Sequence, residues 1–238
     1  MSWQLSDHSA VSDNGLCHMA WAPTAPAQAA RIAVHGHQGC VWQAFAVSPL
    51  PTHALQPEEI YIRGDDLIAK FGQSASDSYA FQLDWQLLSV APPVIFGVEL
   101  WLSVHTALLD TEPAMEVSCS GPAEQRWRCF DHAALSGRGA GEESLQATPP
   151  VSQPAALVCQ SAESSALWLI EPSDQRHAQL LSEASCGPPR IRLFGHFLEK
   201  GVIRRARMRF LICEGGLELA EVARQYLEFA QSELPLTA

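Results

Sequence analysis

Apolar and polar residues alternate through two neighbouring stretches in the first half of the chain. In residues 79–87 the odd positions are apolar, whereas in residues 98–108 the apolar side chains occupy even positions. Successive side chains of a strand point to opposite faces, so each stretch predicts a strand with one apolar and one polar face. The Ala91-Pro92-Pro93 segment between them predicts two antiparallel neighbours in a sheet whose polar face is not covered by the apolar core.

Charge constrains the register of these two strands. If Asp84 lay directly opposite Glu99, the polar faces would match but two like charges would be adjacent, which is unfavourable. A shift by two residues places Asp84 opposite Trp101 and keeps the polar faces matched. We therefore expect the register that pairs Asp84 with Trp101.

The rest of the chain continues the pattern of short strands and ends in one helix. Apolar residues recur with a helical period through residues 217–232, which predicts an α-helix laid against a sheet. The predicted fold is all-β, a large antiparallel β-sandwich with this one C-terminal α-helix. Further strands are predicted at residues 16–21, 31–35, 40–47, 59–63, 67–71, 156–160, 166–171, 191–198 and 202–213.

The segment 136–154 is rich in glycine and proline and has the composition of a long loop. We expect a single domain over residues 1–238 with a loop at this point. The alternative is a division into two parts, 1–135 and 155–238.

Composition narrows the range of functions. The chain holds 26 acidic against 15 basic residues, a formal net charge of −11, and such a surface repels nucleic acid and anionic membranes. The N-terminus lacks the features of a signal peptide, and no stretch of about 20 apolar residues predicts a membrane span. Seven scattered cysteines without a Cys-x-x-Cys pair favour free, mostly buried thiols and a cytoplasmic location. Because glycine-rich phosphate-binding motifs are absent, we expect no cofactor.

The polar face of the two alternating strands carries the main candidate site. An aromatic ring beside carboxylates and amides suits a carbohydrate, because the ring stacks on C–H groups while the polar groups bind hydroxyls. Glu99 and His105 are candidates for general base and acid. The candidate ligand-binding residues are Trp101, Asp84, Gln82, Gln86 and Arg63. Alternatively, the face is simply solvated, or it binds another protein.

Three further groups of residues have both a chemical and a structural interpretation. His35 and His37 flank a glycine and can present two imidazoles to a metal, or they are ordinary loop residues. Arg63 is followed by Gly64-Asp65-Asp66, where an arginine–aspartate pair closing a turn is the commoner use. Arg205, Arg207 and Arg209 alternate along one strand face and either bind an anion or pair with carboxylates of a neighbouring strand; we favour the pairing. 

Residues 194–204, Phe-Gly-His-Phe-Leu-Glu-Lys-Gly-Val-Ile-Arg, together with the alternating strands and the uncovered polar face, resemble galactose-mutarotase-like supersandwich proteins over about residues 30–213. Enzymes of that family use a histidine and a glutamate on a concave sheet to open and close aldose rings. The resemblance implies a small sugar or sugar acid as ligand. It also implies His105 or His196 in the histidine role and Glu99 or Glu199 in the glutamate role.

Overall fold

A computed structural model describes most of the chain. The described residues are 2–6, 9–37, 39–52, 55–73, 79–122, 127–137, 153–161, 163–181 and 188–233. Most of the loop predicted at 136–154 lies outside them. No helix in these ranges is long and apolar enough to cross a membrane.

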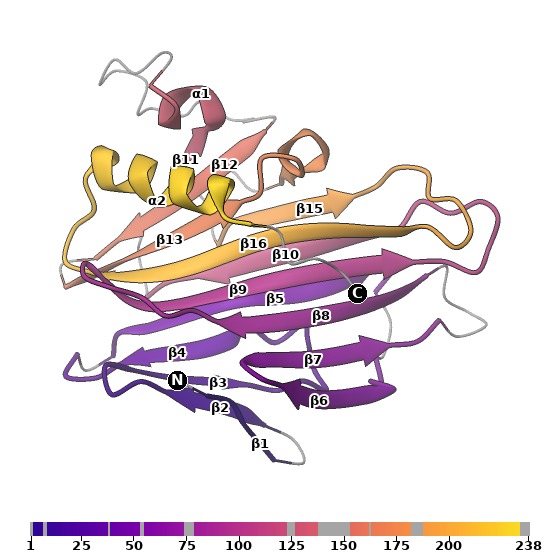
Figure 1. Cartoon of the computed structure of the whole chain (residues 1–238), viewed down its shortest axis with the longest axis horizontal. Helices are drawn as coiled ribbons and strands as arrows, with labels where there is room; N and C mark the ends of the chain where they lie inside the picture. The colour runs from indigo at the N-terminus through magenta and orange to yellow at the C-terminus, as the bar shows by residue number, and fades with distance from the viewer. Residues whose placement is uncertain are drawn as a thin grey trace.

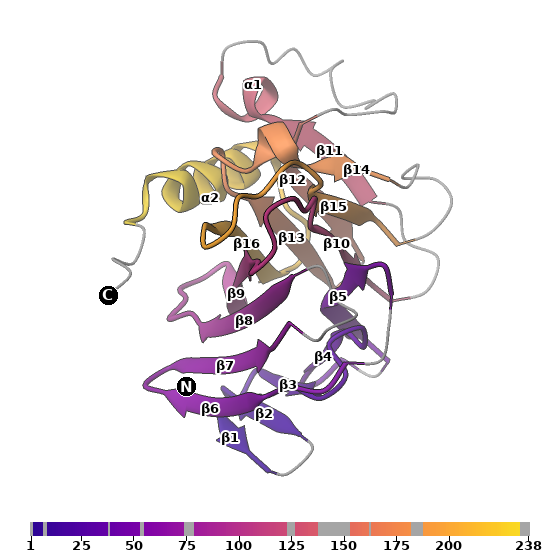
Figure 2. The same ribbon diagram turned by 90° about the vertical axis from the view of Figure 1, so that its right-hand side faces the viewer.

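The described residues form two antiparallel sheets of eight strands each (Figures 1 and 2). Sheet A contains, in spatial order, β1 (Gln4–Leu5), β2 (Ala10–Asp13), β3 (Cys17–Trp21), β4 (Ala30–Val34), β5 (Val41–Leu50), β10 (Ala114–Ser120), β15 (Arg190–Phe194) and β14 (Gln179–Leu180). Sheet B contains β11 (Trp127–Asp131), β12 (Pro154–Gln160), β13 (Ser164–Ile170), β16 (Ile203–Glu214), β9 (Val94–His105), β8 (Ala80–Leu87), β7 (Asp66–Phe71) and β6 (Glu59–Arg63). The predicted all-β sandwich is confirmed.

Sheet pairing links distant parts of the sequence. In sheet A, β10 pairs with β15, and in sheet B, β9 pairs with β16, so each sheet combines strands from both sides of segment 136–154. Within the β8–β9 pair, Asp84 lies opposite Trp101, which is the register that the charge argument predicted.

The main core lies between the sheets and is rich in aromatic side chains. Trp85 and Trp168 of sheet B have their rings 5.6 and 6.2 Å from the ring of Phe45, which β5 contributes from sheet A. Phe45 has a φ of 54°, and it and Ala44 are both buried, so the alternation of β5 is interrupted there. This local distortion inserts an additional ring into the core, where aromatic edge-to-face contacts stabilise the sandwich.

The C-terminal helix α2 (Leu219–Gln231) covers the outer face of sheet B over β12 and β13 (Figure 1). Val222, Tyr226 and Phe229 of α2 pack with Val158 and Leu167 in a second core, next to the short helix α1 (His132–Leu135). Strands β12 and β13 are therefore buried on both faces over residues 154–159 and 164–170, and their sequences are apolar at 154–159 and 166–170. The helix does not extend over the outer face of β8, β9 and the first part of β16.

The strand predicted at 191–198 ends earlier, at Phe194. Phe194 and Gly195 have φ values of 65° and 71°, which turns the chain out of the ladder, and Leu198 returns only as an isolated bridge to Thr111. β10 and β11 were not predicted. β10 is only seven residues long, and the side chains that it buries, at every second position, are identified by their packing against the facing sheet.

Candidate functional site

The polar face of sheet B is a grid built from β8, β9 and β16, which lie side by side. Strand pairing aligns four rows across these strands: Gln86–Glu99–Arg209, Asp84–Trp101–Arg207, Gln82–Ser103–Arg205 and Ala80–His105–Ile203. The first row lies toward α2 and the last lies at the far end of the strands. Each row thus brings together residues more than 100 positions apart in the sequence.

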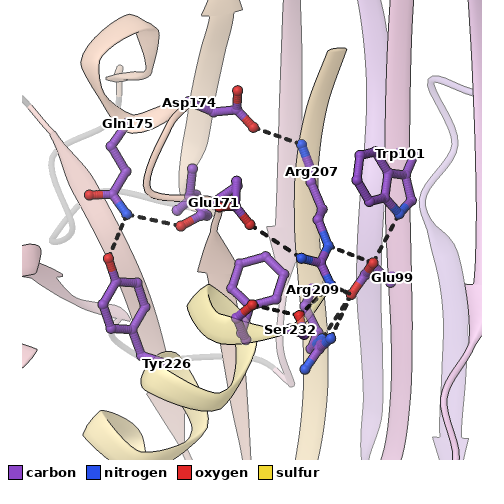
Figure 3. Close-up of polar contacts among 11 residues, drawn as sticks. Glu99, Trp101, Glu171, Asp174, Gln175, Arg207, Arg209, Tyr226 and Ser232 are labelled. Atoms are coloured by element: carbon purple, nitrogen blue, oxygen red, sulfur yellow. Dashed lines mark hydrogen bonds and ion pairs between the residues drawn. The ribbon is translucent and has the colours of Figure 1, made fainter. Parts of the chain in front are cut away.

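Glu99 closes the end of the grid that lies under α2 (Figure 3). Its side chain is 1% exposed, and Oε1 accepts hydrogen bonds from Arg207 Nε at 2.6 Å and from Trp101 Nε1 at 2.9 Å. Oε2 accepts from Arg207 Nη2 at 2.9 Å and from Nε and Nη2 of Arg209 at 2.9 and 2.8 Å. Both carboxylate oxygens are therefore bound by fixed donors, as expected for a structural ion pair.

Arg207 connects this row to the helix and to the loop after β13. Its Nη1 lies 3.3 Å from Oε2 of Glu171, its Nη2 donates to Ser232 Oγ at 2.8 Å, and its guanidinium lies 4.5 Å from the ring of Phe229. The predicted pairing of the alternating arginines with carboxylates is confirmed for Arg207 and Arg209. Arg205 differs, because it has no ion pair in the described part of the chain.

Two carboxylates on the loop after β13 were not singled out from the sequence. Burial raises the pKa of Glu171 despite the nearby guanidinium of Arg207. Burial also raises the pKa of Asp174 to about 6, opposed by the hydrogen bond of 2.9 Å that its Oδ2 accepts from Arg207 N. Their signal in the sequence is that Glu171 directly follows the apolar run 166–170 and Asp174 stands three residues later. Desolvated carboxylates with shifted pKa values are common at functional sites.

Two cavities open beyond the closed end. The first, of about 450 Å³, is called the His105 cavity and is lined by His105, Ser103, Gln82, Phe71 and Phe81, among others. The second, of about 440 Å³, is called the Arg204 cavity. Its polar lining comes from Ser173, Asp174, Arg176, His177, His196 and Arg204. Both cavities are also lined by Ile203 and Arg205, so they meet at these two side chains.

Comparison with known proteins identifies the architecture. No family model and no curated protein matches the chain. An Escherichia coli K12 structure described as a "putative aldose 1-epimerase" matches with a TM-score of 0.50 and 8% identity, covering 85% of this chain and 97% of that chain. The fold is a galactose-mutarotase-like supersandwich. At such low identity, the likeness establishes the fold alone.

Two other solved structures are similar. One, from Klebsiella pneumoniae subsp. pneumoniae MGH 78578, is also described as a "putative aldose 1-epimerase"; it has a TM-score of 0.49 and 10% identity, covering 98% of this chain and 93% of that chain. A "putative kojibiose phosphorylase" from the human microbiome has a TM-score of 0.46 and 8% identity. This chain covers only 36% of that longer protein, which covers 96% of this chain.

The supersandwich separates the four residues proposed for acid–base roles. His105 lines the His105 cavity and His196 lines the Arg204 cavity. Glu99 lies in the ion-pair network, whereas Glu199 is exposed in the turn between β15 and β16 and lines neither cavity. Of these four residues, the two histidines line a cavity and the two glutamates do not.

The residues proposed for ligand binding also lie in different environments. Gln82 lines the His105 cavity, and its Nε2 donates to Asp84 Oδ1 at 2.6 Å, while burial raises the pKa of Asp84. Trp101 is half-buried, and its ring lies 5.2 Å from the guanidinium of Arg207. Gln86 pairs with Glu99 in the first row. Arg63 lies 3.5 Å from Asp66 in the β6–β7 turn, as the commoner interpretation of that motif predicted.

The proposed metal-binding histidines contact different carboxylates. His35 Nε2 lies 3.2 Å from Asp13 Oδ2, whereas His37 Nδ1 lies 2.8 Å from Glu163 Oε2. Across the described residues, no group of three or more histidine, cysteine, aspartate or glutamate side chains is arranged to hold a metal ion. Each histidine therefore has an identified carboxylate partner on the protein.

Proposed function

We propose that the protein binds a carbohydrate on the open half of the grid, in the joined His105 and Arg204 cavities. The observation that carries the proposal is that the two cavities, of about 450 and 440 Å³, meet at Ile203 and Arg205 on the polar face of a supersandwich sheet. Each volume lies within the range of typical small-molecule sites. Together they provide room for a sugar of one or a few units.

The lining of the His105 cavity suits a sugar ring. Ile203, which is 57% exposed, lines the cavity and supplies apolar surface for C–H groups, whereas the stacked rings of Phe71 and Phe81 border it from the buried core. Gln82, Ser103 and His105 supply donors and acceptors for hydroxyl groups from the opposite strands. Trp101 stands one row further toward α2 and provides a half-exposed ring at the boundary of the site.

We propose that the titratable groups lining the cavities provide acid–base chemistry. Conversion at the anomeric carbon of an aldose requires a base to accept the hydroxyl proton and an acid to protonate the ring oxygen as the ring opens. His105, His196 and Asp174 line the open space, and the pKa of Asp174 is raised to about 6, a range suited to proton transfer near neutral pH. Glu99 would instead hold the framework of the site.

A protein-binding role for the same end of the sandwich is the second candidate. Leu108, Leu109, Phe197 and Ile203 are large exposed apolar residues on the β9–β10 and β15–β16 connections and the start of β16. These connections are joined by a hydrogen bond of 3.1 Å from Gly201 N to Thr106 O. Exposed apolar residues beside a polar face are a common feature of protein interfaces.

Thermal unfolding with a panel of monosaccharides, sugar acids, sugar phosphates and short oligosaccharides tests the sugar proposal. A ligand at about a hundred times its dissociation constant adds roughly 2.7 kcal/mol, which raises Tm by about 5–10 °C for a chain of this size. We expect one class of ligand to raise Tm for the wild type but not for His105→Ala. His18→Ala, which removes a half-buried histidine of β3 in sheet A, is the matched control.

Two outcomes would contradict the sugar proposal. A panel that leaves Tm unchanged for the wild type would favour the protein-binding candidate. An equal rise in wild type and His105→Ala would remove the His105 cavity from the site.

A further inference from the structure

We infer that the sugar carries an anionic group, a phosphate or a carboxylate, which the guanidiniums of Arg176, Arg204 and Arg205 hold in the Arg204 cavity. This inference rests on the proposed function and specifies the chemical class of its ligand. All three arginines line the cavity, and Arg205 also lines the His105 cavity. A sugar in the His105 cavity can therefore extend a charged substituent past Arg205.

The three guanidiniums have no ion pair or hydrogen bond to any described residue. Several other arginines do have such partners: Arg207 and Arg209 bind Glu99, and Arg190 and Arg192 lie 3.6 and 2.8 Å from Glu116. The chain has 26 acidic residues for 15 basic ones, so carboxylates are plentiful. A group of unpaired guanidiniums in one cavity of an acidic protein creates a local site for an anion.

The end of β13 explains how neighbouring residues of β16 reach the same cavity. The ladder between these strands ends at the pair Ile170–Met208, after which Glu171 N donates to Arg207 O at 3.1 Å. From Ala206 back to Ile203, no strand of the described residues pairs with β16 on that edge. Side chains from both of its faces, including Arg204 and Arg205, therefore line the space that β13 leaves open.

The remaining polar groups of the cavity are compatible with an anion. Asp174, the one carboxylate among the described residues that line it, accepts the backbone N–H of Arg207 at 2.9 Å. The rings of His177 and His196 stack with centroids 4.4 Å apart, and Nδ1 of His196 is buried with no hydrogen-bond partner among the described residues. Phe194 lines the cavity with a φ of 65°, a conformation that non-glycine residues rarely adopt and that is frequent at ligand sites.

Guanidinium groups bind phosphate and carboxylate through paired, charge-assisted hydrogen bonds. A sugar phosphate and a uronic acid therefore share the required chemistry. Both present the charge at the edge of a sugar ring, where it can enter the Arg204 cavity while the ring occupies the His105 cavity.

The test is calorimetric titration of the full chain with aldohexoses, their 6-phosphates, the corresponding uronic acids and inorganic phosphate. We expect an anionic sugar to bind at least about tenfold more tightly than its neutral counterpart, with affinity falling as salt is added. Arg204→Gln/Arg205→Gln should remove this advantage. Arg31→Gln/Arg128→Gln, which removes the same charge from β4 and β11, is the control and should retain it. The preference between 6-phosphate and uronic acid identifies the source of the anion.

Each outcome separates the inference from the proposed function. If neutral and anionic sugars bind equally well, or the Arg204→Gln/Arg205→Gln variant weakens both equally, the anionic inference is wrong and the sugar proposal stands. If inorganic phosphate binds through these arginines and sugar phosphates bind no more tightly, the anion site stands without a sugar. If no member of the panel binds, both fail.

Discussion

Arg207 Nε lies 2.6 Å from Oε1 of Glu99, and the two side chains are only 4% and 1% exposed. The pair joins β16 to β9 beneath α2, and the same carboxylate also binds Arg209 and Trp101. A sequence pattern that suggested a catalytic glutamate has thus become a buried ion pair at the closed end of the grid. Its neighbours along the same strands remain open to the cavities.

Glu99→Gln should strongly destabilise the fold. The substitution keeps the shape of the side chain but leaves two guanidiniums without a counter-charge, and breaking a buried ion pair of this kind costs about 3–5 kcal/mol. Urea unfolding measures the loss. Glu199→Gln, at an exposed position, should change the free energy of unfolding by less than about 0.5 kcal/mol. A Glu99→Gln protein as stable as the wild type would show that this carboxylate is not needed for folding.

Asp174→Asn should change how stability depends on pH. The pKa of Asp174 is raised from 3.8 to about 6 in the folded protein, chiefly by burial, so between these values the folded state holds a proton that the unfolded state has lost. This residue therefore makes the free energy of unfolding fall as pH rises through that window, by an amount on the order of 2 kcal/mol.

Urea unfolding across this pH window tests the effect. The stability of Asp174→Asn relative to the wild type should increase between about pH 4 and pH 6 and then stay constant. Asp110→Asn, at an exposed position, should show no such change. A constant difference between Asp174→Asn and wild type would contradict the raised pKa.

Tyr226→Phe should lower the free energy of unfolding by about 1–2 kcal/mol. The Tyr226 hydroxyl accepts a hydrogen bond of 2.9 Å from Gln175 Nε2 and lies 2.8 Å from His132 Nδ1, so it links α2 to α1 and to the loop after β13 (Figure 3 shows Tyr226 and Gln175). A double-mutant cycle with His132→Ala should show less than additive losses, because both substitutions remove the same contact. Fully additive losses would argue against this link.

The six described cysteines should resist alkylation in the folded protein. All six are buried, and burial raises the pKa of Cys17, Cys129, Cys159 and Cys213 to about 12. Only the thiolate reacts readily, so little modification is expected at about pH 8. Peptide mapping after iodoacetamide treatment, with and without denaturant, checks each site. Rapid labelling of any of the six without denaturant would indicate local opening. The seventh, Cys186, lies outside the described residues.

The alternation in β8 and β9 was sufficient to predict two strands, the face each presents to the core and the pairing of Asp84 with Trp101. These features follow from neighbouring residues and from the two-residue period of a strand. The helical period of 217–232 likewise predicted α2 and its apolar face. The sequence alone therefore determined the class of fold and the composition of the polar face.

Tertiary structure decided which part of that face is open. Glu99 and His105 stand six residues apart on the same side of β9, yet Glu99 is enclosed by Arg207 and Arg209, and His105 lines a cavity. That difference depends on where β16 pairs and where α2 lies, both of which come from residues about 100 positions later. Asp174 and Arg176 likewise belong to the site because of the tertiary structure. β13 ends at Ile170, and the loop after it reaches the edge of β16. Local periodicity describes the neighbours of a side chain along its own strand, whereas its burial and ion pairs depend on residues that only the complete fold brings into contact.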